Sequence, residues 1–283
     1  MLNKIRKKDN IFTDWLIRFL YLIIILFFGG PILWLISLSL RTPQQLFTNP
    51  PQILPNPISF ESYRYIFRGK EIINFIKNSV LLSLYSCIGT LIIVIPGAYA
   101  LSRFRIRFKK QIMIMILLFK MISPLIIAVP MYRYFSKIGL IGGHLSCAMV
   151  YIAAQIPFIT YLVKGYFDSV PYSIEESAMI DGCSRFASLI KIVLPISIGG
   201  LFSAFIFIFL MSWSEFIIPF IMLDSNKLMP LSVGIYLFQE SRASVDTHIV
   251  SAITVITIIP PIIIFWILQR HIVQVLIGGA VKE

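Results

Sequence analysis

The sequence predicts an all-α membrane protein of about six transmembrane helices, on three observations. Hydrophobic residues make up 58% of the 283 residues, only 13% are charged, and the mean hydropathy is +0.86. A soluble domain has roughly 25% charged residues, and a soluble fold of this size would not cover so apolar a chain. Six apolar stretches each approach the length of about 20 residues that crosses a bilayer. Lysine and arginine gather mostly between these stretches.

The predicted spans begin with a stretch that is too long for a signal peptide, whose apolar region has about 7–15 residues, and no cleavage site follows it. We therefore expect an uncleaved first helix. Pro96 and Pro157 lie inside predicted spans, where proline is expected to kink or end a helix. The six spans are 15–39, 78–101, 111–134, 144–163, 196–222 and 249–269.

Short basic links set the orientation, because cytosolic loops carry the excess of lysine and arginine. The link 102–110 contains five basic residues and no acid, and the basic N-terminus agrees with a cytosolic position two spans earlier. The outer segment 40–77 also carries basic residues, diluted and mixed with acids. We predict a multi-pass protein of the bacterial cell membrane with both termini cytosolic. Its parts are an N-terminal tail 1–14, a membrane domain 15–269 with the inner loop 164–195, a C-terminal tail 270–283, and the outer segments 40–77, 135–143 and 223–248.

The net charge of +12 raises the question of nucleic acid, but its location between spans favours topology control and contact with anionic lipid headgroups. We expect no nucleic-acid partner. The cysteines show neither zinc nor disulfide spacing, and the histidines are scattered near span ends. We therefore expect no metal site and no membrane-embedded enzyme.

The loop 164–195, between spans four and five, is longer than a simple link needs. Pro171 begins a helix with Glu175 and Glu176 in its first turn, where the helix dipole favours anions. Asp181-Gly182 then breaks the helix, because glycine accepts the left-handed backbone of a tight turn. A second amphipathic stretch follows, and the proline at 195 opens the fifth span.

This pattern predicts a helix–turn–helix at the cytosolic surface. Two interpretations remain open on composition alone. The helix either rests on lipid or fits a groove on a soluble partner, where Ser177, Ala178 and Gly182 permit close approach.

The order Glu176-Ser177-Ala178, two residues, Asp181-Gly182, and then Ile192-x-Leu194-Pro195 resembles the EAA loop of ABC importer permeases. That pattern is E-A-A, two residues, D-G, about nine residues and I-x-L-P. Ser177 replaces the first alanine, which is a small-for-small change.

Other stretches resemble the carbohydrate-uptake branch of that family, the maltose-type second permease. They are Asn78-Ser79, the run 97–103, Trp213-Ser214-Glu215-Phe216 with Pro219, and the tail 269–282. Ser214 stands where asparagine is usual, and Val275 and Glu283 stand where glycine is commoner. The resemblance covers nearly the whole chain.

The resemblance implies a permease subunit that binds no cofactor and is not itself an enzyme. The chain has no G-x-x-x-x-G-K-[ST] phosphate loop, so ATP and Mg²⁺ would be used by two separate cytosolic ATPase subunits. A second homologous permease and an extracytoplasmic solute-binding protein would complete the importer. The solute would be a sugar or oligosaccharide, with glycerol phosphate or another sugar derivative as the alternative. The implied coupling residues are Glu175, Glu176, Ser177, Ala178, Asp181, Gly182, Ile192 and Pro195.

Two charged residues, Lys120 and Glu215, fall inside predicted spans. Charges at this depth are costly and usually face a cavity or a partner. They either line the translocation path, together with Trp213, or pair structurally with another helix. A secondary transporter would use such charges as a proton relay, but it would not need the loop 164–195 and often shows paired broken helices or inverted repeats.

Overall fold

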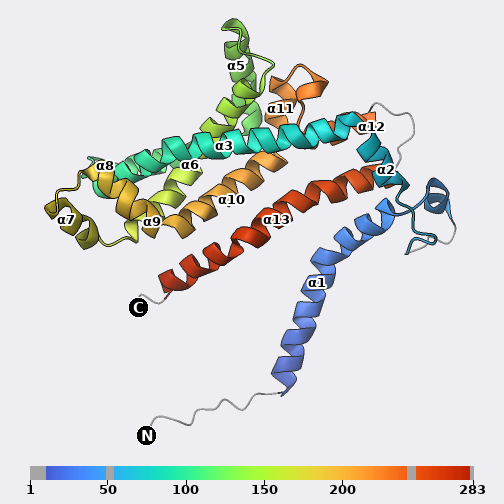
Figure 1. The fold of residues 1–283 in the computed structure, drawn as a ribbon, viewed down its shortest axis with the longest axis horizontal. Coiled ribbons are helices and arrows are strands. Elements are labelled where there is room, and N and C mark those ends of the chain that lie inside the picture. Colours follow the sequence, from blue (N-terminus) through green and yellow to red (C-terminus); the bar gives the residue numbers. More distant parts are fainter. Residues whose placement is uncertain (1–10, 49–53, 241–246, 281–283) are drawn as a thin grey trace. The chain divides into compact units, whose positions relative to one another are not determined.

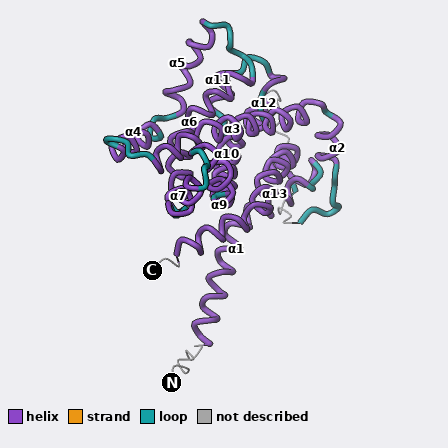
Figure 2. Tube along the Cα trace, turned by 60° about the vertical axis from the view of Figure 1, so that its left-hand side comes forward, coloured by secondary structure: helices purple, strands orange, loops and turns teal. Residues whose placement is uncertain are grey.

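The computed structural model describes residues 11–48, 54–240 and 247–280, and every regular element within these ranges is helical (Figure 2). This confirms the predicted all-α class. The residues form two compact units, 1–68 with 243–256 and 69–242 with 257–283, which are described separately. The first ten residues of the predicted N-terminal tail and Val281, Lys282 and Glu283 of the C-terminal motif lie outside the described residues.

Four helices are long and apolar enough to cross a membrane, and the number rises to six if each of two bent pairs counts as one span. The predicted number of about six spans agrees with the higher of these two counts. The four are α1 (Ile11–Ser39), α3 (Lys70–Arg103), α6 (His144–Asp168) and α13 (Thr247–Ala280). Pro96 lies inside α3 and Pro157 inside α6, so of the two predicted effects of proline, a kink or a helix end, neither residue ends its helix.

The predicted span 111–134 is broken near its middle. Helix α4 (Lys109–Phe119) and helix α5 (Pro124–Lys137) meet at 85° across four residues, and they leave the break in different directions (Figure 2). Ser123 precedes a proline that starts α5, a position where the missing N–H costs no helical bond. The break therefore falls where the sequence places a proline.

The predicted span 196–222 is divided between two helices. Helix α10 covers only Ile198–Ser214, and it bends by 80° from the preceding piece Arg185–Ile196. Residue Glu215 then takes an extended conformation, and a separate helix α11 (Ile217–Met222) begins. Helix α10 ends because the backbone of Glu215 is extended. The apolar composition of the segment does not predict this conformation.

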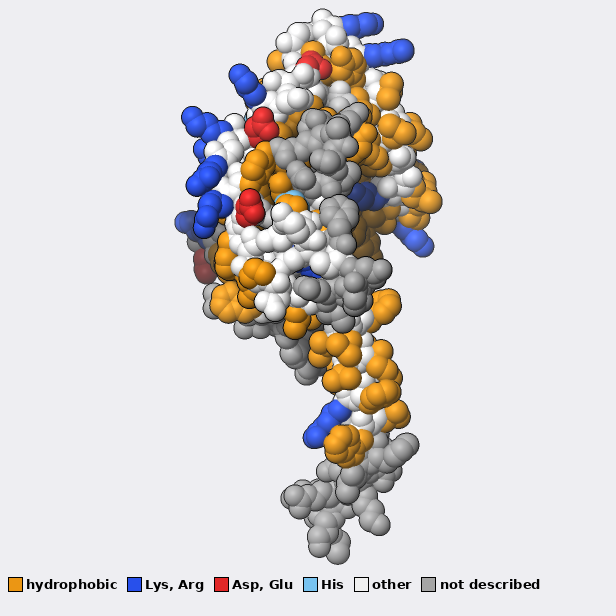
Figure 3. Space-filling view, turned by 90° about the vertical axis from the view of Figure 1, so that its right-hand side faces the viewer, with side chains coloured by type: hydrophobic (Ala, Val, Ile, Leu, Met, Phe, Trp, Pro, Cys, Tyr) orange, Lys and Arg blue, Asp and Glu red, His pale blue; other side chains and the backbone are white. Residues whose placement is uncertain are grey.

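The first unit contains α1, the 3₁₀ turn Pro43–Phe47 and helix α2 (Glu61–Arg68). The hydroxyls of Ser39 and Tyr63 are 2.8 Å apart and join the end of α1 to α2. None of the most apolar window of α1 is buried within the chain, and hydrophobic side chains cover the helix along its length (Figure 3). Such a surface is stable against lipid or another protein.

The second unit is built on α3, which packs along α6 and α10, and these three helices run side by side (Figure 1). The N-terminal part of α3 also packs on α12 (Leu231–Glu240), and α5 packs on α11. The remaining elements are α7 (Tyr172–Ile180), α8 (Arg185–Ser188), the π-helical turn η2 (Leu189–Val193), α9 (Leu194–Ile196) and the 3₁₀ turn η3 (Asn226–Leu228).

A polar contact ties the three central helices together. The amide nitrogen of Gln155 on α6 donates to the hydroxyls of Ser86 on α3, at 3.0 Å, and Ser212 on α10, at 2.8 Å. Hydrogen bonds between spanning helices contribute about 0.6 kcal/mol each. They add specificity to an interface that otherwise depends on van der Waals packing.

Close packing between α6 and α10 depends on glycine. A Cβ atom at Gly200 would lie 2.2 Å from the ring of Tyr166, whereas a Cβ at Gly165 would meet nothing within 4 Å. The contact thus requires a residue without a side chain on α10.

We expect Gly200→Ala to destabilise the protein by about 1–3 kcal/mol, because the added methyl group overpacks the contact. Gly165→Ala, the matched control on the same helix pair, should be neutral or slightly stabilising, since it lowers the entropy of the unfolded chain. Thermal unfolding in detergent measures both. Equal melting temperatures for the two variants would contradict the assigned contact.

Candidate functional site

The loop that the sequence singled out contains a short helix with a well-defined end. Helix α7 begins after Pro171, and Gly182 follows it with a φ of +89°. The N–H of Cys183 donates to the carbonyl oxygen of Ala178 at 3.0 Å, and the N–H of Gly182 donates to that of Met179 at 3.1 Å. This is the double hydrogen bond of a Schellman end, which satisfies carbonyl groups that the helix leaves free. The predicted turn at Asp181-Gly182 is confirmed.

The two neighbouring glutamates of α7 face opposite environments. Glu176 is exposed, whereas only 3% of Glu175 is accessible. The carboxylate of Glu175 forms an ion pair with Arg103, the last residue of α3, and accepts a hydrogen bond of 2.9 Å from the hydroxyl of Tyr99. A buried carboxylate is tolerated only when it is paired and hydrogen-bonded. Glu175 is therefore an internal residue of the site.

The guanidinium of Arg103 also has hydrogen-bond and aromatic partners besides Glu175. One of its terminal nitrogens donates to the carbonyl oxygen of Val170 at 3.0 Å, and the other donates to the hydroxyl of Ser102 at 3.2 Å. Its carbon also lies 4.4 Å from the ring centroid of Tyr172, a cation–π distance. In the sequence, Arg103 stands in the basic link 102–110 and in the run 97–103, and nothing there links it to a residue 72 positions later.

Further hydrogen bonds join the end of α3 to the same loop. The Ser102 hydroxyl donates to Asp168 at 2.6 Å, and the Tyr172 hydroxyl donates to the carbonyl oxygen of Ser102 at 2.7 Å. Asp168 also forms an exposed ion pair with Lys164. The last turn of α3 thus contacts the end of α6 and the start of α7.

The outward face of α7 combines the exposed acid with apolar side chains. Ile180 is 86% exposed and Phe186, on α8, is 68% exposed. Ser177 is exposed, and its hydroxyl donates to the backbone of Ser173 at 2.9 Å. Ile180 was not among the residues predicted from the sequence for this site. Its position just before the Asp-Gly turn was the available signal.

Past the turn, the loop joins the bundle through irregular helix. Ser184 caps α8 by accepting the N–H of Ala187 at 3.2 Å. Ile192 is half-buried in the π-helical turn η2, and Pro195 is exposed in α9, just before the 80° bend. The fifth span does not open at Pro195 as predicted, because its helix starts at Ile198 after that bend.

Lys120 is exposed at the C-terminal end of α4, at the break before α5. The N–H groups of Lys120, Met121 and Ile122 donate three residues back, at 3.0–3.2 Å, and Met121 is 81% exposed. Non-helical backbone at membrane depth is tolerated where protein or water covers it.

Glu215 and Trp213 are engaged inside the protein. One carboxylate oxygen of Glu215 accepts the N–H groups of Ile217 at 3.0 Å and Ile218 at 3.3 Å, and so caps α11. Trp213 is 4% exposed, stacks on Phe209 and donates from its indole nitrogen to the carbonyl oxygen of Thr257 at 3.1 Å.

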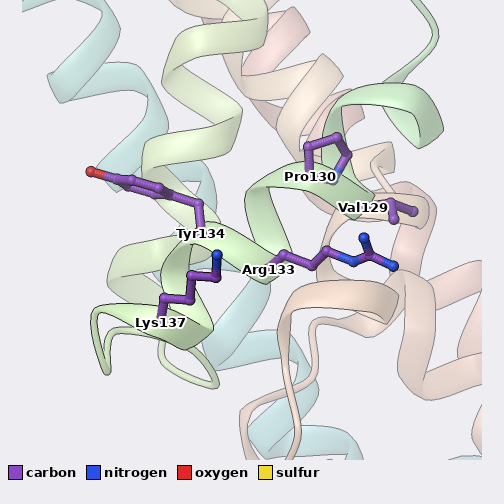
Figure 4. Close-up of a pocket in the computed structure, with 5 residues that line it drawn as sticks. All are labelled: Val129, Pro130, Arg133, Tyr134 and Lys137. Carbon is purple, nitrogen blue, oxygen red and sulfur yellow. The ribbon is translucent and has the colours of Figure 1, made fainter.

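A basic hollow of about 300 Å³ lies on α5, beyond the break. Arg133 and Lys137 extend from its wall, with Val129, Pro130 and Tyr134 beside them (Figure 4). Among the described residues no group of three histidine, cysteine, aspartate or glutamate side chains is placed to hold a metal ion.

The chain resembles permease subunits along its whole length. It is 29% identical to the sulfoquinovosyl glycerol transport system permease protein SmoH of Agrobacterium fabrum, over 97% of this chain and 96% of the relative. It is also 29% identical to the galactooligosaccharides transport system permease protein GanQ of Bacillus subtilis, over 99% and 98%. A chain of a bacterial ABC transporter involved in the import of the acidic polysaccharide alginate has the same fold, with a TM-score of 0.79, 22% identity and coverage of 94% and 99%.

These likenesses agree with the helical architecture and with the motif on α7. Residues 71–277 match the family described as binding-protein-dependent transport system inner membrane component. The chain therefore belongs to this family, as a multi-pass membrane permease subunit of an ABC importer.

Proposed function

We propose that this permease forms, with a second homologous permease, the membrane pathway for a sugar or oligosaccharide. An extracytoplasmic binding protein delivers the solute, and two cytosolic ATPase subunits supply the energy. The names of the relatives support a carbohydrate solute, because SmoH and GanQ are both named for the transport of sugar-containing compounds.

The proposed coupling to an ATPase is supported by the different environments of the two sides of α7. One side of the helix is fixed to the protein through Glu175, and the other side presents Glu176 and Ile180 to the outside. Exposed apolar side chains next to an acid form a suitable core and rim for a protein interface. The outward side is the docking face for an ATPase subunit, with the small side chains of Ser177 and Ala178 allowing close approach and Asp181-Gly182 fixing the turn.

The orientation follows from the same loop. A docking face for a cytosolic ATPase requires that the turn Gly182 and the basic link 102–110 lie on the cytosolic side, in agreement with the positive-inside rule. Both termini are then cytosolic, and the hollow on α5 with Arg133 and Lys137 lies on the outer side.

Lys120 is our candidate for a residue of the translocation path, because it is exposed beside an irregular backbone segment. Glu215 and Trp213 support the wall of that path, the first by capping α11 and the second by packing against α13. A cation on the path also favours the second candidate solute class, an anionic sugar derivative. No acidic residue occurs between Arg103 and Asp168, the stretch that contains Lys120.

Replacing Ile180 with glutamate should remove the ATPase from the complex, because it places a second acid at the centre of the docking face. The permease is tagged in its native host, extracted in mild detergent and assayed for co-purified ATPase, alongside Glu176→Arg and Gly182→Pro. Ile138→Glu makes the same chemical change at an exposed residue near the other end of the bundle and should retain the ATPase. Retention of ATPase by all docking-face variants would overturn the proposed role of α7.

Lys120→Cys should react with a charged, membrane-impermeant thiol reagent, because the reacting thiolate forms only in water. The three native cysteines are first replaced by alanine. Phe27→Cys, on the apolar surface of α1, is the control for a lipid-facing position and should remain unlabelled. Labelling of neither cysteine, with and without Mg·ATP, would assign Lys120 to structural pairing.

A further inference from the structure

The ion pair that joins α7 to α3 is buried, and the polar atoms of both its side chains have hydrogen-bond partners. The side chains of Arg103 and Glu175 are 3% and 4% exposed. Both carboxylate oxygens of Glu175 have donors, and all three guanidinium nitrogens of Arg103 have acceptors. Removing one partner of such a pair leaves an uncompensated buried charge, which is strongly unfavourable. The two side chains therefore stay together.

Helix α7 is connected to the bundle by three routes. At its N-terminal end it follows α6 across the three residues 169–171. At its C-terminal end it packs on α8 and η2, which lead through the 80° bend into α10. The link to α3 consists of side chains, with Arg103 and Tyr99 on one helix and Glu175 on the other, and no intervening backbone.

Helix α3 connects the ion pair to most of the second unit. This helix packs on α6, α10 and α12, and it is 34 residues long, about 50 Å at the helical rise. A displacement applied to its cytosolic end at Arg103 therefore acts on the helix at the centre of the second unit, whose other end contacts the loop near η3. Asn78, for example, donates to the carbonyl oxygens of Lys227 at 2.8 Å and Met229 at 3.0 Å.

We propose that the Arg103–Glu175 ion pair is a strut that makes α7 and the cytosolic end of α3 one rigid body. A movement of the docked ATPase is then delivered to α3 through the ion pair, in addition to the routes along the chain into α6 and α10. Glu175 and Arg103 are positioning residues, and Glu176 is the glutamate that meets the ATPase. This inference rests on the proposed function, because it requires an ATPase on the outward face of α7.

The test is a distance measurement between α7 and α3 in the complete importer. Spin labels are placed at Ile174→Cys, on the side of α7 away from the docking face, and at Ile92→Cys on the exposed surface of α3. The native cysteines are replaced by alanine. Pulsed electron paramagnetic resonance gives the distance distribution without nucleotide and after trapping with Mg·ATP and vanadate.

A narrow distribution that is the same in both nucleotide states is expected for the otherwise unchanged protein. Glu175→Gln and Arg103→Gln should broaden it and shift it between the two states. The control Lys164→Ala removes the exposed ion pair with Asp168 on the same side of the bundle and should leave the distribution narrow. A distance that changes with nucleotide in the unchanged protein, or single variants that keep its narrow distribution, would refute the strut.

If the single variants fail to assemble, the double variant Arg103→Glu with Glu175→Arg is measured instead. Restored assembly with a narrow distribution supports the strut, whereas restored assembly with a broad distribution that differs between the two nucleotide states overturns it. If the unchanged permease purifies without any ATPase, the proposed function itself falls. If the ATPase is retained but α7 and α3 move independently, only the strut is lost.

Discussion

Inside a bilayer, a backbone N–H or C=O group that leaves its helix finds no water to replace the lost hydrogen bond. The irregular features of this permease follow from that constraint. Where α10 ends, the carboxylate of Glu215 accepts the first N–H groups of α11. Where α4 ends, the chain tightens into three-residue hydrogen bonds and a proline starts the next helix. These two interruptions are thus each accompanied by a local replacement for the helical bonds.

The same reasoning explains why the charged cluster lies at the end of α3. An ion pair is costly to bury because both charges lose their water, and at the membrane surface that loss is smaller than at the bilayer centre. The pair of Arg103 and Glu175 is completed by neutral groups, the hydroxyl of Tyr99 and the carbonyl oxygen of Val170. These neutral groups offset the loss of water from the two charges, and the burial of both side chains keeps them in one arrangement.

The helical class and the approximate number of spans were accessible from the sequence, because long apolar runs report directly on the bilayer. The turn at Gly182 was accessible too, since a left-handed backbone position favours one residue type. The breaks at Lys120 and Glu215 were not, because apolar composition is the same in a straight helix and in two bent ones. The different roles of Glu175 and Glu176 were also hidden, since a partner 72 residues away decides which of them is buried.

A docking loop transmits force only if it is stiffer than the connection that it must move. The covalent route from the C-terminal end of α7 into the bundle passes through a turn at Gly182, a π-helical segment and an 80° bend, and each of these has fewer regular helical bonds than a straight helix. A multiply hydrogen-bonded ion pair between α7 and the longest described helix of the second unit bypasses all three. The C-terminal part of the loop therefore need not be rigid in the proposed coupling, because α7 is held at its other end, by the short connection to α6 and by the contact of Glu175 with the last turn of α3.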